Sequence, residues 1–349
     1  MAMHASDLEY DLPTEFIAQH PAARRDASRL LVLDRSSGGI RHETFSCLPK
    51  HLRNGDVLVL NNTRVLPARL IGRRSSGGKI DVLLVREVRA GLWETLLTGS
   101  RRLRENEPLE FEEGALNAAY RGHAENGLPL IEFDDPADFH QRLADCGRAP
   151  LPPYIKRQAF GDDSRAEDLG RYQTVYADKP GAIAAPTAGL HYTPELLEEV
   201  GRAGVTIETI TLHVGPGTFK PVKAETVEEH RVDPEYYEVP EGLPERLLEA
   251  RAAGRRIVAV GTTSCRVLES LARMPQGRWQ LSGWTNLFIY PPFEFRWISA
   301  LQTNFHLPRS SLLALVFAFA GRERVLEAYE QAKTRGYRFY SYGDAMLIV

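Results

Sequence analysis

The sequence predicts a two-domain α/β protein, in which a larger, barrel-like α/β domain carries an inserted small β-barrel domain. Three observations predict this class. The 349 residues are too many for one average domain. Both ends of the chain alternate buried-strand patterns with helical periodicity. Between them, residues 68–150 contain short, partly alternating segments separated by turns. We therefore expect the α/β domain to comprise residues 1–67 and 151–349, and the inserted all-β domain to comprise residues 68–150.

The first predicted elements are two buried strands. Leu30–Leu33 and Val57–Leu60 are short continuous apolar runs, and the second ends in the polar turn Asn61-Asn62-Thr63. Within the insert, Asn126-Gly127 is the dipeptide that a type I′ turn prefers, because both central residues of that turn need positive φ. A tight β-hairpin is therefore expected around residues 126–127.

The α/β pattern resumes after three prolines at positions 150, 152 and 153. The periodicity predicts, in order, a helix over 193–204, a strand over 205–214, a helix over 243–254, a strand over 257–260 and a helix over 265–274. A last apolar run, Leu312–Ala320, is far shorter than the ~20 residues of a membrane-spanning helix. Ser311 and Gly321 beside this run indicate the two ends of a buried helix instead.

Composition narrows the class of protein. The formal net charge of −3 gives no overall basicity from which to argue nucleic-acid binding. Cys47, Cys146 and Cys265 are odd in number and far apart, which favours a reduced, cytoplasmic setting over a disulfide framework or a zinc cluster. The first residues lack the apolar segment of a signal peptide. The phosphate-binding, zinc-protease and nucleophile-elbow signatures are absent from the sequence, and the GxG at residues 215–217 lacks the third glycine of a dinucleotide-binding loop.

Polar side chains directly follow the second predicted strand. Residues 61–69 contain two amides, a hydroxyl and two guanidinium groups, which suit recognition of planar polar groups or phosphate. The alternative is a turn whose asparagines bond to its own backbone and whose arginines are solvated. The two interpretations are equally good.

Two further segments place a histidine beside glycine. His191 lies among small residues in segment 184–193, and one interpretation is that it acts as a general base. The alternative is a tight strand-to-helix connection, in which Thr193 caps the helix begun by Pro194 and His191 makes a structural hydrogen bond. His213 ends an apolar strand in segment 211–219, where the glycines serve a site or merely a bend. Two histidines at the ends of elements favour a shared cleft.

Three last segments complete the candidate set. Gly261–Ser264 joins a strand to a helix, where exposed N–H groups favour a carboxylate or another anion, although a plain N-cap explains Thr263 or Ser264 equally well. Residues 303–308 and 341–346 also combine polar groups with His, Gly or Asp. Each of these two segments is alternatively a loop held by its own hydrogen bonds.

Local basic clusters are candidates for RNA contact. No acidic residue interrupts the run from Arg64 to Lys79. The cations that we consider for RNA binding are Arg69, Arg73, Arg74, Lys79, Lys156 and Arg157, with Arg101, Arg102 and Arg104 as further basic residues. Tyr154, Tyr172 and Tyr176 lie near the last pair and are candidates to stack on unpaired bases. The alternative is a solvated charged surface, which is what such runs usually form.

The polar segments and their flanking strands carry a specific resemblance that spans nearly the whole chain. The matching pieces, in order, are DLP, IAQHP, RDASRLLVLDR, GDVLVLNNTRVLPARL, LPPYI, YQTVYA, AAPTAGLHYT, TLHVGPGTF, VGTTSCRVLE, TNFHLP, AFAG and YRFYSYGDAM. Together they resemble the S-adenosylmethionine:tRNA ribosyltransferase-isomerases of queuosine biosynthesis. The resemblance also implies an inserted β domain within an α/β domain. The chain departs from the family pattern at Asp233, Pro292 and Ser299, so no catalytic role is expected for Asp233 or Ser299.

The resemblance implies a reaction and its partners. The ribosyl group of S-adenosylmethionine would be transferred to, and isomerised on, a 7-aminomethyl-7-deazaguanine at the wobble position of a tRNA. The product would be epoxyqueuosine-tRNA, with adenine and methionine released. S-adenosylmethionine would be a consumed co-substrate, and neither a resident cofactor nor a metal is expected, because the sulfonium is itself an activated leaving group. A monomer without membrane association is expected.

The same resemblance suggests roles for individual residues. His191 and His213 would transfer protons, and Asp344 would orient one of them or the acceptor amine. Thr262 and Thr263 would hold the methionine carboxylate. The complete set of expected substrate contacts is Asn61, Asn62, Arg64, Thr187, Gly189, Thr262, Thr263, Asn304 and His306. The rival functions are a non-catalytic RNA-binding protein and an S-adenosylmethionine-dependent methyltransferase.

Overall fold

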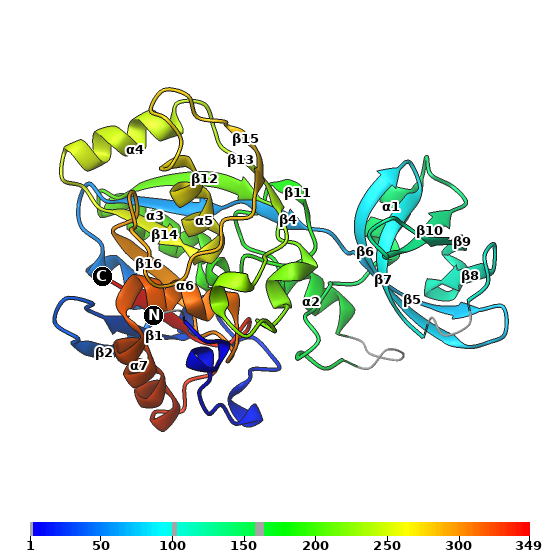
Figure 1. The fold of residues 1–349 in the computed structure, drawn as a ribbon, viewed down its shortest axis with the longest axis horizontal. Coiled ribbons are helices and arrows are strands. Elements are labelled where there is room, and N and C mark those ends of the chain that lie inside the picture. Colours follow the sequence, from blue (N-terminus) through cyan, green and yellow to red (C-terminus); the bar gives the residue numbers. More distant parts are fainter. Residues whose placement is uncertain (1–2, 100–102, 158–163) are drawn as a thin grey trace. The chain divides into compact units, whose positions relative to one another are not determined.

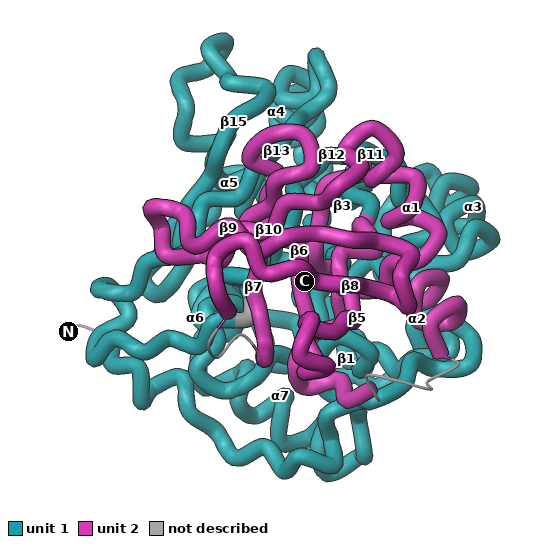
Figure 2. The backbone as a smooth tube through the Cα atoms, turned by 90° about the vertical axis from the view of Figure 1, so that its right-hand side faces the viewer, with its two compact units in different colours: residues 1–64, 174–179, 185–349 teal, residues 65–173, 180–184 magenta. Residues whose placement is uncertain are grey.

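A computed structural model describes residues 3–99, 103–157 and 164–349, and its chain divides into two compact units (Figures 1 and 2). The larger unit contains residues 1–64, 174–179 and 185–349, and the smaller unit contains residues 65–173 and 180–184. The smaller unit is thus longer than the predicted insert. The reason lies partly in residues 180–184, where the Ala182 carbonyl accepts a hydrogen bond from the Leu66 amide and Ile183 packs into the barrel core.

The larger unit is built on a nine-stranded sheet with the order β15-β13-β12-β3-β14-β16-β17-β1-β2. Its strands are β1 (Arg29–Leu33), β2 (Ile40–Thr44), β3 (Val57–Asn61), β12 (Thr206–Leu212), β13 (Glu235–Glu238), β14 (Ile257–Val260), β15 (Ser282–Thr285), β16 (Ala300–Asn304) and β17 (Ala345–Ile348). The sheet is open, with β15 and β2 as its two edges, where a barrel-like domain was expected. Both edge strands are largely solvent-facing, which fits strands that pair on one side only.

Four central strands, β12, β3, β14 and β16, run parallel to one another. Every residue of β3, β14 and β16 is buried, as continuous apolar runs in parallel strands covered on both faces require. Strand β17 is antiparallel to β16, and β1 is parallel to β17. The carboxyl ends of the four parallel strands therefore share one edge of the sheet with the amino ends of β1 and β17. Ligands of open α/β sheets bind at this kind of edge.

Helices cover the sheet of the larger unit. These are α3 (Pro194–Arg202), α4 (Leu243–Ala252), α5 (Gly261–Leu271), α6 (Ser311–Ala320) and α7 (Arg322–Thr334), with the short 3-10 helices η4 (Phe45–His51), η6 (Thr187–His191) and η7 (Pro216–Phe219). One core cluster packs Phe45 of η4 and Val200 of α3 against Leu58 and Val258 of the sheet. Helix α5 packs along the four parallel strands. These contacts fix the positions of the loops at the carboxyl edge.

The smaller unit contains a closed barrel with the strand order β10-β7-β6-β5-β8-β9. Its elements are β5 (Arg69–Arg74), β6 (Lys79–Arg89), β7 (Leu92–Thr98), β8 (Pro108–Phe111), β9 (Leu116–His123), β10 (Pro129–Phe133), α1 (Phe139–Cys146) and α2 (Arg165–Arg171). In β6, Ile80, Val82 and Leu84 alternate into the barrel core, as the period of two predicts. The α/β class with an inserted β-barrel is confirmed. Strands β4 (Thr63–Val65) and β11 (Lys179–Ala182) form a separate pair.

Local predictions were confirmed with small corrections. Strand β14 coincides with the predicted 257–260, and Thr193 caps α3 by accepting a hydrogen bond from the Leu196 amide at 3.2 Å. The hairpin at 126–127 exists, but only Gly127 has positive φ, because the turn is centred one residue earlier, on Glu125 and Asn126, with the Gly127 amide donating to the Ala124 carbonyl at 2.9 Å. The cap of α6 is Ser310 rather than its neighbour. Across the described residues, no helix is long and apolar enough to cross a membrane.

Candidate active site

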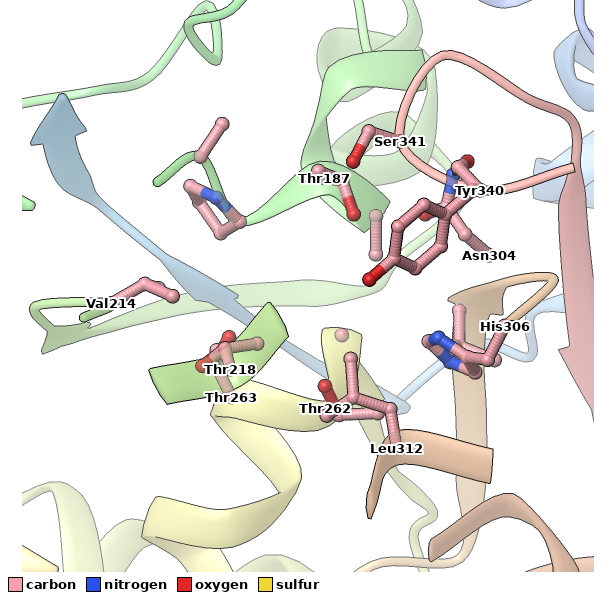
Figure 3. A pocket seen from close by; sticks show the side chains of 15 residues that line it. Thr187, Val214, Thr218, Thr262, Thr263, Asn304, His306, Leu312, Tyr340 and Ser341 are labelled. Carbon is pink, nitrogen blue, oxygen red and sulfur yellow. Dashed lines mark hydrogen bonds between the residues drawn. The ribbon is translucent and has the colours of Figure 1, made fainter. Parts of the chain in front are cut away.

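A pocket opens at the carboxyl edge of the larger unit's sheet (Figure 3). The pocket is partly open to solvent. Its walls are made of backbone, hydroxyl and apolar groups with one amide and one imidazole, and none of the lining side chains is a carboxylate, a lysine or an arginine. The lining residues are Ala185, Pro186, Thr187, Ala188, Val214, Thr218, Gly261, Thr262, Thr263, Thr303, Asn304, His306, Leu312, Tyr340 and Ser341.

Five of the nine expected substrate contacts line this pocket: Thr187, Thr262, Thr263, Asn304 and His306. Thr262 and Thr263 stand in the first turn of α5, which begins at Gly261 with φ +85. The N–H groups of a first helical turn have no partner within their helix and favour an anion. The Thr263 hydroxyl accepts a hydrogen bond from Asn61 Nδ2 at 3.3 Å.

Gly189 is required by close packing in η6. A Cβ at this position would overlap the Tyr176 hydroxyl and lie 2.8 Å from the Thr174 methyl group. Gly189 itself is not part of the pocket lining. Its contribution is therefore to let η6, which supplies Thr187, lie tightly against Tyr176.

Asn304 is held in a fixed orientation at the end of β16. Its Nδ2 lies 3.0 Å from the Tyr340 carbonyl oxygen, which can only accept a hydrogen bond, so the amide nitrogen must face that carbonyl. The same nitrogen lies 3.3 Å from His191 Nε2 and donates to it as well. Asn304 Oδ1 is buried and has no hydrogen-bond partner among the described residues.

His191 consequently has a defined tautomer. Because Nε2 accepts from Asn304, the ring proton lies on Nδ1, which donates to the Ser28 hydroxyl at 2.7 Å. Ser28 donates its own proton to the Arg25 carbonyl at 3.1 Å. The ring also packs 5.0 Å from Phe45. Both nitrogens of His191 are thus engaged inside the protein.

Burial keeps two of the site's histidines neutral. Burial lowers the pKa of His191 to about 3, and the nearby Arg338 and Arg25 guanidinium groups act in the same direction. Burial also lowers the pKa of His306 to about 3, and His306 Nε2 is hydrogen-bonded to Thr303 Oγ1 at 2.9 Å. A general base works best with a pKa near the operating pH, so neither ring is well suited to that task.

His213 differs from the other two histidines. It is half-buried at the end of β12, its Nδ1 lies 2.8 Å from the Thr63 hydroxyl, and its ring stacks on Tyr236. Within the described chain, its Nε2 has no hydrogen-bond partner. Burial lowers its pKa, and Glu238 partly opposes that change. His213 therefore keeps an available nitrogen, which the other two rings lack or bury. His213 itself does not line the pocket, but Val214 and Thr218 of its segment do.

Asp344 bonds to the backbone around it. One carboxylate oxygen accepts from the Arg29 amide at 2.9 Å, and the other accepts from the Arg338 amide at 2.8 Å. The intervening residue Tyr340 has φ 73, a strained value for a side chain of that size, and lines the pocket with Ser341. Asp344 therefore holds the backbone of the loop that supplies Tyr340 and Ser341 to the pocket wall. Its expected role in orienting a catalytic group stays a prediction.

The three expected contacts at the end of β3 make intramolecular hydrogen bonds. Asn61 bonds to both the amide and the carbonyl of Leu212, and thereby continues the pairing of β3 with β12. Asn62 Oδ1 accepts from the Thr211 hydroxyl at 2.7 Å. Arg64 is exposed and donates to the Ala177 carbonyl at 2.7 Å. None of the three lines the pocket within the described chain.

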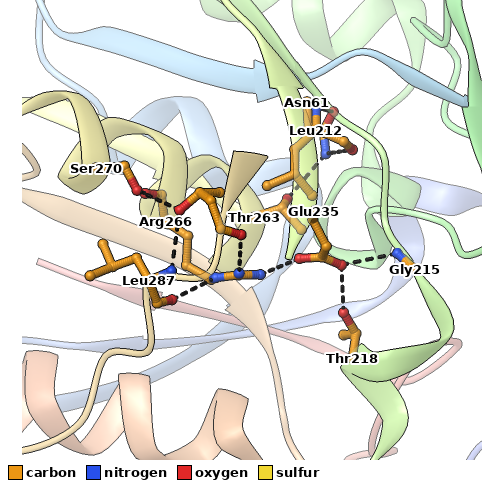
Figure 4. A network of polar contacts seen from close by, with 10 residues as sticks. Asn61, Leu212, Gly215, Thr218, Glu235, Thr263, Arg266, Ser270 and Leu287 are labelled. Carbon is orange, nitrogen blue, oxygen red and sulfur yellow. Dashed lines mark hydrogen bonds and ion pairs between the residues drawn. The ribbon is translucent and has the colours of Figure 1, made fainter. Parts of the chain in front are cut away.

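Sequence reasoning missed a buried ion pair behind the pocket (Figure 4). Glu235 and Arg266, 4% and 8% exposed, pair directly. The other oxygen of Glu235 accepts from the Gly215 amide at 3.0 Å and the Thr218 hydroxyl at 2.9 Å. Arg266 also donates to the Leu287 carbonyl at 3.0 Å. The pair therefore ties the loop carrying Thr218 to α5. No sequence motif links positions 235 and 266.

The predicted RNA-binding cations are largely engaged inside the smaller unit. Arg69, Arg74 and Arg157 each form a two-pronged ion pair, with Asp81, Glu107 and Asp168 respectively. Arg73, Lys79 and Lys156 are exposed and have interactions of their own. Arg101 and Arg102 lie outside the described residues. Tyr172 is fully buried, so its stacking on a base would require a rearrangement, whereas Tyr176 is half-buried with a buried hydroxyl.

The fold and the pocket are those of an α/β protein with a candidate site for a small polar molecule at the carboxyl ends of its central strands. The side chains suit hydrogen bonding and proton transfer. Within the described ranges, no group of three or more His, Cys, Asp or Glu residues is arranged to hold a metal ion.

Comparison with known proteins identifies the family. The profile of the queuosine biosynthesis protein family matches residues 5–348. Proteins named S-adenosylmethionine:tRNA ribosyltransferase-isomerase from Thermotoga maritima and Carboxydothermus hydrogenoformans are 48% and 49% identical, each alignment covering 99% of this chain and 100% of the relative. The crystal structure of S-adenosylmethionine tRNA ribosyltransferase from Thermotoga maritima matches with a TM-score of 0.55 and 38% identity, over 99% of this chain and 100% of that one. The chain belongs to the queuosine biosynthesis protein family, whose curated members are named as transferase-isomerases.

Proposed function

We propose that this protein transfers and isomerises the ribosyl group of S-adenosylmethionine onto 7-aminomethyl-7-deazaguanine at the tRNA wobble position. The product would be epoxyqueuosine-tRNA, and adenine and methionine would leave. One observation carries the proposal. The pocket is lined by the segments that carry the family resemblance, namely residues 184–193, 211–219, 261–264, 303–308 and the loop before β17.

The reaction makes three chemical demands. A base must remove a proton from the carbon next to the sulfonium, whose positive charge acidifies that carbon. The departing adenine must receive a proton or a hydrogen bond, and the acceptor amine must be neutral to attack. Well-placed proton transfer contributes about 10²- to 10⁴-fold to such a rate.

His213 is the histidine that best meets the first demand. It is neutral, half-buried and has an available Nε2, whereas both nitrogens of His191 are occupied. The Thr63 hydroxyl at Nδ1 can orient the ring and stabilise the imidazolium that forms when Nε2 accepts a proton. The first turn of α5, with Thr262, would receive the methionine carboxylate.

The test is an incubation of the full chain with S-adenosylmethionine and tRNA carrying the 7-aminomethyl-7-deazaguanine. We expect equal amounts of adenine and methionine, formed only when that tRNA is present. S-adenosylhomocysteine as the product would indicate a methyltransferase, and neither product would indicate a binding protein; either result contradicts the proposal. His213→Gln, which keeps a hydrogen-bonding group but cannot accept a proton at neutral pH, should lower kcat at least ~10²-fold.

A further inference from the structure

We propose that Asn304 Oδ1 accepts a hydrogen bond from the α-ammonium group of the S-adenosylmethionine methionine moiety, and that His191 is the positioning residue that holds Asn304 in this orientation. The inference rests on the proposed function for the identity of the ligand. It adds a subsite to that function and replaces the proton-transfer role expected of His191.

Asn304 has one polar side-chain atom that no group in the described part of the chain engages. Its two N–H groups are committed to the Tyr340 carbonyl and His191 Nε2, which leaves Oδ1 as the remaining polar atom. Oδ1 is buried, lacks a partner among the described residues, and belongs to a residue of the pocket lining (Figure 3). A buried acceptor without a partner costs about 1–3 kcal/mol, so it is poised for a ligand that brings an N–H donor.

The amide of Asn304 cannot flip without losing its hydrogen bonds. Rotation of its amide by 180° would bring Oδ1 against the Tyr340 carbonyl, and both oxygens would be acceptors. It would also face His191 Nε2, which carries no proton in the tautomer that donates to Ser28. The chain of hydrogen bonds from Ser28 through His191 to Asn304 thus leaves an acceptor, and not a donor, as the atom of Asn304 that is available to a ligand.

The position of Asn304 relative to α5 indicates which N–H group of the ligand would bind Oδ1. The pairing of Val260 with Gln302 sets the start of α5 beside the end of β16, on strands about 5 Å apart. A helix N-terminus for a carboxylate and an acceptor for an ammonium thus lie next to each other. The α-carbon of an amino acid carries both groups. The pocket lining has no charged side chain, which suits a zwitterion better than a lone cation.

The test compares three ligands by calorimetry: S-adenosylmethionine, an analogue with the α-amino group replaced by hydrogen, and an analogue with the adenine amino group replaced by hydrogen. Wild-type protein should bind the first analogue about 10- to 100-fold more weakly than S-adenosylmethionine, the range for one hydrogen bond to a charged group. In Asn304→Leu, which keeps the branched shape, this ratio should fall to near 1. A ratio of two affinities in one variant is insensitive to a general loss of folded protein.

Two further variants separate positioning from structure. His191→Phe keeps a ring beside Phe45 but frees the amide of Asn304, so the ratio should fall partway while the pH profile of kcat keeps its shape. Gln302→Leu is the matched control, because Gln302 is a fully buried amide on the same strand, has no partner within the described chain and does not line the pocket. Its ratio should equal that of wild type.

The inference would be overturned if wild-type protein bound the α-deamino analogue as well as S-adenosylmethionine. It would also be overturned if Asn304→Leu kept the wild-type ratio for that analogue, or if this variant stopped distinguishing S-adenosylmethionine from the adenine analogue and not from the α-deamino analogue. A change in the kcat pH profile of His191→Phe would restore His191 as a proton-transfer group and overturn its positioning role. Binding is measured without turnover, so failure of the proposed function, seen as no adenine release, is a separate result.

Discussion

The buried ion pair behind the pocket gives the sharpest prediction about stability. Glu235→Gln keeps the shape of the side chain and one oxygen for the Gly215 amide and the Thr218 hydroxyl. It places an NH₂ group against the Arg266 guanidinium, where two donors face each other. Arg266 is 8% exposed, so its positive charge would remain buried without its counter-charge.

The magnitude follows from that burial. Removal of one partner of a buried ion pair typically costs 3–5 kcal/mol, because the other charge stays desolvated. The substituted amide keeps its oxygen contacts, and Arg266 keeps its hydrogen bond to the Leu287 carbonyl, so the expected loss lies near the lower end, at about 3 kcal/mol. Loosening of the loop that carries Thr218 should also weaken S-adenosylmethionine binding.

The assay is urea unfolding followed by tryptophan fluorescence. Three of the four tryptophans, at positions 279, 284 and 297, belong to the larger unit and report on it. The matched control is Glu198→Gln, which breaks an ion pair with Arg202 whose side chains are 74% and 73% exposed and should cost nothing measurable. A loss below about 1 kcal/mol in Glu235→Gln would refute the reasoning that the pair is desolvated.

Three other predictions concern the pocket walls. Gly189→Ala should lower the melting temperature and the affinity for S-adenosylmethionine, because the new methyl group would overlap the Tyr176 hydroxyl. Adding Tyr176→Phe should partly restore the melting temperature. An unchanged melting temperature in Gly189→Ala would contradict this close packing. Asp344→Asn should lower the free energy of unfolding by about 1–3 kcal/mol, because its NH₂ group cannot accept the hydrogen bond of one of the two backbone amides. Equal stability of the variant and wild type in urea would contradict this role of Asp344 in holding the loop. The folded chain keeps His191 and His306 neutral with pKa values of about 3 against an ordinary 6.5, so the unfolded chain binds protons first as pH falls. Unfolding free energy should therefore drop below pH 6.5, by roughly 2 kcal/mol per histidine at pH 5, whereas a flat profile from pH 8 to pH 5 would contradict their burial.

Local signals predicted individual elements well. Strand β14 was found at its predicted residues because a short apolar run between polar turns has few alternatives in an α/β chain. The cap at Thr193 was equally readable, since a threonine before Pro194 combines two helix-start signals. The open edge of the sheet was not predictable, because closure depends on pairing between strands far apart in the chain.

The roles of the site residues depended on tertiary partners. His191 looks like a general base in sequence, and only the folded chain brings Ser28 and Asn304 to its two nitrogens. The Glu235–Arg266 pair joins β13 to α5 and leaves no local pattern. Contacts between residues so far apart in the chain cannot be predicted from local sequence patterns.

The basic run from residue 64 to residue 79 shows the same limit for charge. It contains no acidic residue, which favoured an RNA-binding surface. Its partners, Asp81 and Glu107, come from other parts of the barrel and balance Arg69 and Arg74. Carboxylates on neighbouring strands therefore neutralise two cations of the run, whereas Arg64, Arg73 and Lys79 stay exposed and their contact with RNA stays a prediction.

The most direct test of the central claim follows the ribose carbons. S-adenosylmethionine labelled in its ribose is incubated with the protein and tRNA bearing 7-aminomethyl-7-deazaguanine, and the tRNA is digested to nucleosides. The account predicts that the label appears in the wobble nucleoside in a one-to-one ratio with released adenine. Label that stays in small molecules, or a transferred methyl group in its place, would contradict ribosyl transfer by this pocket.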